Sequence, residues 1–215
     1  MAGMTAEPAG PSPAPAPVRG TVLATVLAAA FPALDAVPVL DRPDLVAEPV
    51  LQALRRGDLG DPAHLAVLVA AIDPALADTA AFCAAYDVPA ERSANCVVVS
   101  GRREGEVRWA AAVVLATTRA DVNGAVRRRM DVRKVSFGGH DETVAATAME
   151  YGGITPVGLP AGWPVLVDSA VAAAGPVVIG SGVRGSKLVL DGASLGALPT
   201  AEVLDGLGRP VPAAP

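Results

Sequence analysis

The chain has 215 residues and a formal net charge of -5, with 52% hydrophobic and only 3% aromatic residues. This length holds one good-sized domain plus a tail, and the apolar content excludes an intrinsically disordered chain. The core must be built from Ala, Val and Leu. The acidic balance excludes a generally basic nucleic-acid binder, so any contact with phosphates needs a local basic patch.

The first 44 residues differ in composition from the rest. Residues 1–20 are rich in Pro and Ala, which predicts a disordered, extended tail. Residues 21–44 begin with the apolar run Thr21–Phe31, which is too short to span a membrane. We expect a short helix packed on the domain, with a wrongly extended start site as an alternative. Export is disfavoured because the region before the run is poor in basic residues. We therefore expect a cytoplasmic protein.

Periodicity and boundary residues predict a succession of short helices and strands from residue 48 onward. Pro49 and Gly57 bound the first helix, and Asp78 caps the second. The charged turn Gly101–Gly105 joins the strands on either side of it into a hairpin. The predicted helices are Glu48–Arg56, Asp78–Tyr86, Arg119–Met130, Asp141–Glu150 and Ser169–Ala174, and the predicted strands are Asn95–Ser100, Val107–Thr117, Val165–Asp168 and Lys187–Leu190, with short closing elements at Ala193–Leu198 and Ala201–Leu207. Residues 209–215 are expected to fray.

The cysteines and histidines form no recognisable metal or nucleophile motif. Cys96 adjoins the apolar run Val97–Val99 and is interpreted as a buried core thiol. His64 and His140 lie far apart without clustered Cys or carboxylate residues. A zinc site is therefore not expected. A Ser-His-Asp hydrolase is not expected either. We expect no metal and no cofactor.

The segment Tyr151–Leu159 is the most distinctive stretch of the sequence. Its three glycines and one proline, in the order Gly152, Gly153, Pro156 and Gly158, cannot lie inside a helix or a central strand. Such a loop presents unpaired N–H groups, which suit it to hold a carbonyl or an oxyanion. An ordinary helix-to-strand connection is the alternative, because Gly and Pro punctuate most loops.

The surrounding motifs resemble a known family. Gly152-x-x-x-Pro156 is followed by Gly158, then by Asp168 at the end of an apolar run, and then by the glycine-rich turn Gly180–Gly185. In order and spacing this is similar to the YbaK/prolyl-tRNA-synthetase-associated (INS-like) domain, which includes free-standing deacylases of mischarged aminoacyl-tRNA. The resemblance spans residues 45–208 and is stronger in the second half.

The resemblance implies an α+β fold with a mixed, mostly antiparallel, partly closed β-sheet core and surrounding helices. The sequence pattern agrees, because strands and short helices alternate without crossover helices of βαβ length. The resemblance also implies a catalytic loop, in which the backbone N–H groups of Gly152, Gly153 and Ile154 would bind the oxyanion. Thr155 would orient water or substrate, or bond within the turn instead.

One position departs from the family pattern. Well-known deacylases of the family carry a pocket lysine where this chain has Asn95, and its two lysines, Lys134 and Lys187, lie elsewhere. An amide donates and accepts hydrogen bonds but carries no charge, so its contact with a phosphate or an oxyanion is weaker. Asn95 is either a catalytic residue that orients the substrate or a polar strand end bonded to the backbone.

The resemblance implies two further groups of residues. Asp168 would bind the ammonium of the amino acid or hold water, although it could equally cap the helix that follows. Basic residues near the predicted helix end would contact the tRNA backbone, or complement the carbonyl end of that helix. The substrate-binding candidates are Pro156, Gly158, Asp168, Ser181, Gly182 and Arg184, and the tRNA-binding candidates are Arg128, Arg133 and Lys134.

The predicted function is that of a trans-acting deacylase, which hydrolyses the ester of mischarged aminoacyl-tRNA. Its partner would be the acceptor end of tRNA, without a metal or a membrane. The alternative is a module of the same fold that binds aminoacyl-tRNA, or an amino-acid-like ligand, without turnover. A third possibility is an exported protein that reuses the fold. The amino acid, the tRNA and the oligomeric state stay open.

Overall fold

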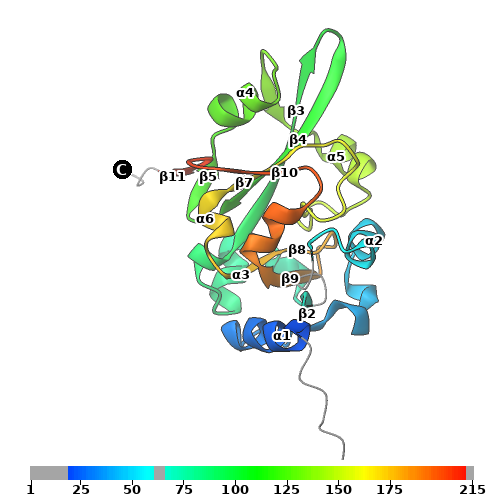
Figure 1. Cartoon of the computed structure of the whole chain (residues 1–215), viewed down its shortest axis with the longest axis vertical. Coiled ribbons are helices and arrows are strands. Elements are labelled where there is room, and N and C mark those ends of the chain that lie inside the picture. Colours follow the sequence, from blue (N-terminus) through cyan, green and yellow to red (C-terminus); the bar gives the residue numbers. More distant parts are fainter. Residues whose placement is uncertain (1–18, 61–65, 212–215) are drawn as a thin grey trace, which may run out of the picture.

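Two β-sheets joined at one corner form the framework of the protein (Figure 1). The computed structural model describes residues 19–60 and 66–211. Its helices are α1 (Arg19–Ala30), α2 (Glu48–Arg56), α3 (Thr79–Ala85), α4 (Arg127–Arg129), α5 (His140–Thr147) and α6 (Ser169–Ala172). Its strands are β1 (Val37–Pro38), β2 (Leu68–Ala71), β3 (Ala94–Arg103), β4 (Glu106–Leu115), β5 (Thr118–Ala120), β6 (Val135–Phe137), β7 (Val165–Asp168), β8 (Pro176–Gly180), β9 (Ser186–Asp191), β10 (Ala201–Leu204) and β11 (Gly208–Pro210).

The strand order gives a mixed, mostly antiparallel architecture. One sheet has the order β1-β2-β9-β8, a second has the order β10-β7-β4-β3-β6, and β11 pairs with β5. Within the described residues, only β4–β7 and β7–β10 are parallel pairs. A bridge between Ser93 and Val178 connects β8 to the start of β3, which partly closes the two sheets on each other. The predicted fold class is confirmed.

Three apolar clusters hold these layers together, and they are built mainly from Val, Leu and Ala. The largest lies between the sheets and α2, and includes Val50, Val167 and Leu188. A second lies between the outer face of the β2-β9-β8 sheet and the helices α1 and α3. The third packs the other face of β4 against the segment around α4. The aliphatic core follows directly from the shortage of aromatic residues.

The apolar N-terminal run Thr21–Phe31 forms most of helix α1, as predicted. Its Leu27 is buried, together with Phe31 just beyond its end, in the cluster that α1 shares with α3 and β9. The helix lies at the opposite end of the molecule from the tip of the β3–β4 hairpin (Figure 1). In the part of the chain that the structure describes, no helix is long and apolar enough to cross a membrane. The predicted disordered tail falls almost entirely outside the described residues.

The prediction of one helix over Arg119–Met130 was wrong at its start. Residues Thr118–Ala120 form β5, and a π-helical turn over Val122–Val126 then leads into α4. The cause is Asp121, whose carboxylate accepts hydrogen bonds from the N–H groups of Gly124 and Ala125. A capping carboxylate satisfies the first free donors of a helix, so helical geometry begins only after it.

Two other predicted boundaries also change. The fraying predicted from residue 209 was wrong for Arg209 and Pro210, which pair with β5 as part of β11. The predicted hairpin turn is shorter than Gly101–Gly105, because β3 continues to Arg103. Glu104 and Gly105 make the turn, with φ of 54° and 87°. Two residues with positive φ match the right-handed twist of the flanking strands.

The two tryptophans lie against each other on the second sheet. Trp109 projects from β4 and stacks on Trp163, which precedes β7, with 4.9 Å between ring centroids and 3° between ring planes. An added Cβ on Gly138 would lie 3.0 Å from the Trp109 ring. The stack therefore supports the segment that follows β6.

Candidate active site

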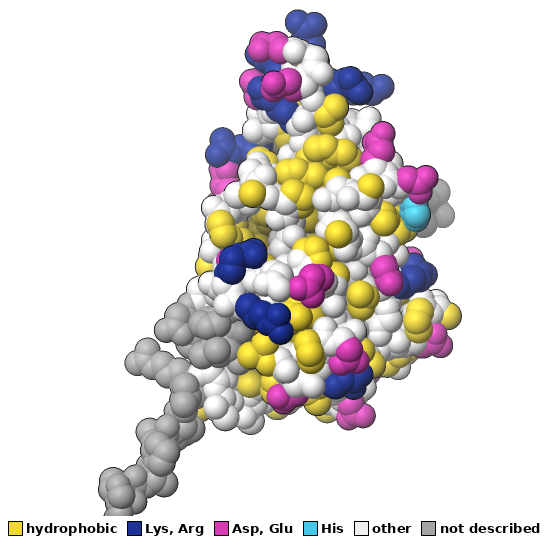
Figure 2. Space-filling view, turned by 90° about the vertical axis from the view of Figure 1, so that its right-hand side faces the viewer, with side chains coloured by type: hydrophobic (Ala, Val, Ile, Leu, Met, Phe, Trp, Pro, Cys, Tyr) yellow, Lys and Arg dark blue, Asp and Glu magenta, His cyan; other side chains and the backbone are white. Residues whose placement is uncertain are grey.

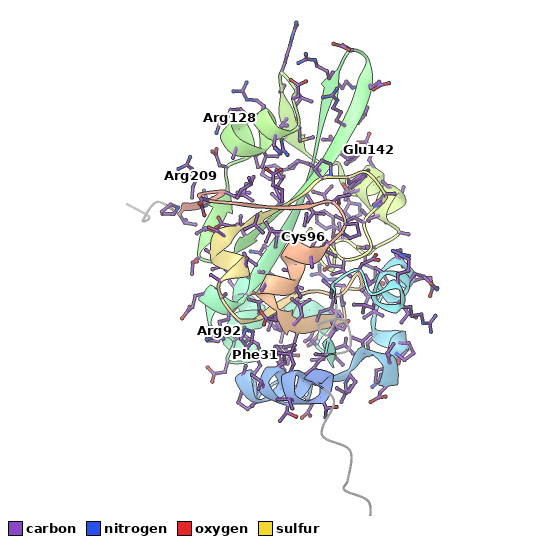
Figure 3. All side chains as sticks on the ribbon, viewed as in Figure 1. Phe31, Arg92, Cys96, Arg128, Glu142 and Arg209 are labelled. Atoms are coloured by element: carbon purple, nitrogen blue, oxygen red, sulfur yellow. The ribbon has the colours of Figure 1, made fainter. Side chains whose placement is uncertain are left out.

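An open pocket of about 440 Å³ lies where β3, the start of α3, the glycine loop (residues 151–159) and the β8–β9 region meet. Cys96 of β3 is one of its lining residues and lies near the centre of the molecule in Figure 3. The polar residues that line the pocket are Asp78, Thr79, Asn95, Thr143, Arg184 and Lys187, and the glycine loop contributes Tyr151, Gly152 and Ile154. Segments far apart in sequence thus converge on one cavity.

The glycine loop packs against the backbone of the turn after β8. An added Cβ on Gly153 would lie within 3.0 Å of the Val183 backbone, so only glycine fits there. The Gly153 carbonyl accepts a hydrogen bond from the N–H of Gly182 at 2.7 Å. The Gly153 N–H donates to the Glu150 carbonyl at 2.9 Å. The prediction of Gly153 as an oxyanion donor was therefore wrong, because this N–H closes the turn.

Two neighbouring N–H groups are available for the predicted role. The N–H groups of Gly152 and Ile154 have no hydrogen-bond partner among residues 19–60 and 66–211, and both residues line the pocket. Gly152 has φ of 88°, a conformation that side chains with a Cβ rarely adopt. The loop can therefore offer two unpaired backbone donors to a ligand in the cavity.

The rest of the loop anchors it to the fold. Thr155 and Pro156 are buried and do not line the pocket, and the Thr155 hydroxyl has no hydrogen-bond partner among the described residues. Gly158 has φ of 83°, and an added Cβ would overlap the Pro49 carbonyl at the start of α2. These three residues fix the loop against the core and α2.

The turn after β8 supplies one pocket residue and two supports. The buried Ser181 hydroxyl bonds to the Ser186 hydroxyl at 2.6 Å, and Gly182 pairs with the glycine loop. Arg184 lines the pocket. Its Nε donates to the Pro74 carbonyl at 3.0 Å, while its Nη1 lies close enough to Gly152 to meet an added Cβ.

Asp168 is a helix cap. Its carboxylate accepts a hydrogen bond from the N–H of Ala170 at 2.8 Å and another from the N–H of Gly208. The side chain is buried and does not line the pocket. Of the two roles predicted for Asp168, the structure shows the cap at the start of α6.

Asn95 lies in the pocket wall, half-buried on β3. Its Oδ1 accepts a hydrogen bond from the Thr79 hydroxyl at 2.8 Å, at the start of α3. No partner for its Nδ2 is found in the described part of the chain. The amide can therefore donate to a ligand, as predicted for a substrate-orienting residue.

Cys96 is not the core thiol that was predicted. It is half-buried and lines the pocket beside Asn95. Desolvation raises the pKa of its thiol to about 12. The thiolate is the nucleophilic form of cysteine, so Cys96 is unreactive near neutral pH.

Lys187 is a pocket residue that the sequence did not reveal. It projects from β9 and is only 8% exposed. Its Nζ donates to the Ala77 carbonyl at 3.3 Å and lies 5.2 Å from the centroid of the Phe82 ring. One feature of the sequence does indicate Lys187: it lies directly before the apolar run Leu188–Leu190, in a segment typical of a buried strand. Lysine is almost never buried in such a strand unless it has a partner.

The buried ammonium makes stability depend on pH. Burial holds the pKa of Lys187 below its ordinary value of 10.5. Between the lowered pKa and 10.5 the unfolded chain binds more protons than the folded one, so the free energy of unfolding rises with pH across that window. Urea unfolding at stepped pH should show wild type gaining stability there relative to Lys187→Met. A difference between the two proteins that stays constant with pH would contradict this.

The predicted tRNA-binding residues lie at one end of the molecule, near the hairpin tip. Arg128, Arg133 and Lys134 are exposed, and their side chains have no hydrogen-bond or ion-pair partner among the described residues. By contrast, Arg127 bonds to the Asn123 carbonyl and Arg129 pairs with Glu202. Figure 2 shows charged side chains of both signs gathered at this end, and Figure 3 shows Arg128 at the outer edge of α4.

Strand β6 connects these basic residues to the pocket. Lys134 directly precedes β6, and Phe137 at the other end of β6 lines the pocket while remaining 70% exposed. Three residues of strand span about 10 Å. A chain of phosphates could therefore reach from the basic residues to the mouth of the cavity, with an exposed aromatic ring at the entrance.

No metal centre is evident in this arrangement. Within residues 19–60 and 66–211, no group of three or more His, Cys, Asp or Glu side chains could hold a metal ion. His64 lies outside the described residues. His140 is exposed, and its ring packs against Tyr151 with 4.6 Å between ring centroids.

The fold and the pocket define an α+β domain in which a glycine-rich loop forms part of the wall of a cavity. Residues 73–198 match the family described as the aminoacyl-tRNA editing domain. The match covers more than half of the sequence, so the chain belongs to this family. The resemblance drawn from the motifs around Gly152 is thereby confirmed. No curated protein matches the chain by sequence.

Several solved structures share this fold. A candidate trans-editing enzyme for prolyl-tRNA synthetase superposes with a TM-score of 0.61 at 18% identity, covering 76% of this chain and 99% of that one. A scaffold protein from a study of computational epitope grafting gives 0.62 at 20% identity, covering 76% and 97%. The hypothetical protein APE2540 gives 0.60 at 18% identity, covering 74% and 99%. At these identities the likeness shows the fold alone.

Proposed function

We propose that the protein is a trans-acting deacylase that hydrolyses the ester between an amino acid and the terminal ribose of mischarged tRNA. The observation that carries the proposal is the pair of unpartnered N–H groups, at Gly152 and Ile154, on a rigid loop in the wall of the pocket. Family membership supports it, because the family is defined by aminoacyl-tRNA editing. Since that ester is made in the cytoplasm, we place the activity there.

The reaction requires few catalytic side chains. An aminoacyl ester is already activated, so the protein has to orient water and stabilise the tetrahedral oxyanion. The two loop N–H groups would bind the oxyanion, and Asn95 would hold the substrate through its free amide N–H. The neighbouring ribose hydroxyl could relay the proton. No metal or cofactor takes part in this scheme.

A binding module without turnover is the second candidate. It is favoured by the shortage of acidic side chains in the pocket. Among the described residues, only Asp78 supplies a carboxylate there. That carboxylate caps α3 by accepting from the N–H of Ala80 at 3.1 Å. The pocket thus holds no side chain placed as a free general base. Binding and hydrolysis must therefore be measured separately.

Single-turnover hydrolysis of a panel of aminoacyl-tRNAs tests the proposal. The panel includes alanyl-, seryl- and cysteinyl-tRNA of mismatched identity, and wild type is compared with Asn95→Ala. Rapid hydrolysis of one species, slowed in Asn95→Ala, supports a deacylase and identifies its substrate. No hydrolysis of any species, with tRNA still bound in a filter assay, supports the binding module instead.

The basic residues before β6 should give tRNA binding a measurable salt dependence. Replacing Arg133 or Lys134 with alanine should weaken tRNA binding and make the plot of log affinity against log salt shallower by about 1 per residue, since each phosphate contact releases a counterion. Arg55→Ala removes an exposed charge on α2 and should leave the slope unchanged. Equal slopes in all variants would show that the tRNA phosphates contact another surface of the protein.

A further inference from the structure

Lys187 is a buried cation that has no carboxylate partner. Its ammonium has three donors, and the Ala77 carbonyl takes one of them. Among the described residues no acidic side chain forms an ion pair with it, and the nearby Asp78 is engaged in capping α3. Nevertheless Lys187 lines the pocket, so its remaining donors are available where a ligand would lie.

The fold holds this charge in place at a cost. Lys187 pairs across the sheet with Gly180 of β8 and Ala70 of β2, and its ammonium lies over the ring of Phe82 of α3. Removing an ammonium from water without a compensating anion is unfavourable, and burial lowers its pKa accordingly. A methionine in this position would pack as well without that cost. Folding alone therefore does not explain why the charge is there.

The electrostatics of the pocket define the group that Lys187 would bind. Arg184 also lines the cavity, so its wall carries two cations against the one carboxylate of Asp78, which caps α3. The reacting end of an aminoacyl-tRNA has one cationic group, the α-ammonium, which this wall disfavours. It also has two sources of anionic oxygen, the phosphate of the terminal nucleotide and the oxyanion that develops during hydrolysis.

We propose that Lys187 is the anion-binding residue of the pocket, delivered from β9, and that its ammonium contacts an anionic oxygen at the reacting end of the substrate. The proposal rests on the deacylase function proposed above and names the residue that supplies charge to that site. The phosphate and the oxyanion share the same chemistry. They differ in timing, because the phosphate is present in the bound ground state and the oxyanion only near the transition state.

Lys187→Met separates these sources, since it keeps the stem and removes the charge. The first arm measures binding of adenosine 5′-monophosphate and of adenosine by calorimetry. If Lys187 contacts the phosphate, wild type should bind the monophosphate about 10-fold more tightly than adenosine, and the variant should bind the two equally. The second arm measures single-turnover deacylation at saturating protein. If Lys187 contacts the oxyanion, the rate should fall by about 10²-fold with nucleotide binding unchanged.

Lys134→Met is the matched control, because it removes the other lysine of the chain. It should weaken binding of whole tRNA and leave the preference for the monophosphate over adenosine as in wild type. Urea unfolding of Lys187→Met should show stability equal to wild type or higher, since a buried charge has been removed. This readout excludes loss of folding as the cause of lost function.

Two results would overturn the proposal. One is a Lys187→Met protein with wild-type nucleotide preference and wild-type deacylation rate. The other is a variant whose loss of activity follows its loss of folded protein. Failure of the deacylase function looks different: wild type would hydrolyse no member of the panel, yet would keep a preference for the monophosphate that depends on Lys187.

Discussion

Replacing Gly153 with alanine is expected to slow single-turnover deacylation by at least about 10²-fold. The added Cβ would lie within 3.0 Å of the Val183 carbonyl carbon and oxygen, and these backbone atoms cannot rotate away. The loop would have to move off the β8–β9 turn, carrying the N–H groups of Gly152 and Ile154 with it. Loss of one well-placed oxyanion donor typically costs a factor of about 10²–10³. Rapid-quench assays of the hydrolysed ester measure the rate.

Two neighbouring glycines make this result interpretable. Gly185→Ala should retain the wild-type rate, because its Cβ would meet only Pro74 at an ordinary contact distance of 3.6 Å. Gly152→Ala should give an intermediate loss, since the clash there is with the flexible end of Arg184 and strain comes from a φ of 88°. A Gly153→Ala protein with the wild-type rate and stability would show that the position of the loop is not critical.

Asp168→Ala is expected to lower the free energy of unfolding by about 2 kcal/mol without changing the rate of deacylation per folded molecule. The substitution removes the cap of α6 and leaves the N–H groups of Ala170 and Gly208 without their acceptor. Loss of a helix cap costs about 0.5–2 kcal/mol, and the half-buried N–H of Gly208 that loses its acceptor adds to this cost. Urea unfolding together with single-turnover kinetics measures both quantities.

Asp168→Asn serves as the control for this experiment. The amide keeps one oxygen acceptor and nearly the same shape, so it should recover part of the lost stability. If Asp168 instead bound the ammonium of the substrate, both variants would weaken substrate binding, with a raised half-saturation constant. That outcome would require the Asp168 carboxylate to face the pocket. In the structure it accepts hydrogen bonds from α6 and β11 instead.

The loop and its partner turn were predictable from sequence because their constraints are local. Gly152 and Gly158 adopt positive φ, and Gly153 approaches another backbone too closely for any side chain. Such requirements restrict a position to glycine, so they are visible as spacing in the chain. The fold class followed for a similar reason, since the lengths of the predicted strands and helices excluded regular βαβ crossovers.

The direction of the hydrogen bonds and the buried charge could not be predicted in this way. Whether the N–H of Gly153 faces a ligand or closes a turn depends on the peptide orientation, which the residue type does not determine. Lys187 enters the pocket only because β9 pairs with β8 in one register and α3 covers that face. Strand register and packing of a helix on a sheet face are long-range properties, so the sequence around Lys187 does not reveal its place in the pocket.

The stacked indoles determine what intrinsic fluorescence can report about this protein. Trp109 and Trp163 are its only tryptophans, and they share one position on the second sheet, so all indole emission comes from a single pair. Neither lines the pocket. A titration followed at tryptophan wavelengths should therefore change little when ligand enters the cavity, while the same signal changes sharply when the segment before β7 separates from β4. The tryptophan pair is therefore an intrinsic probe that reports opening of the sheet rather than occupancy of the cavity by ligand.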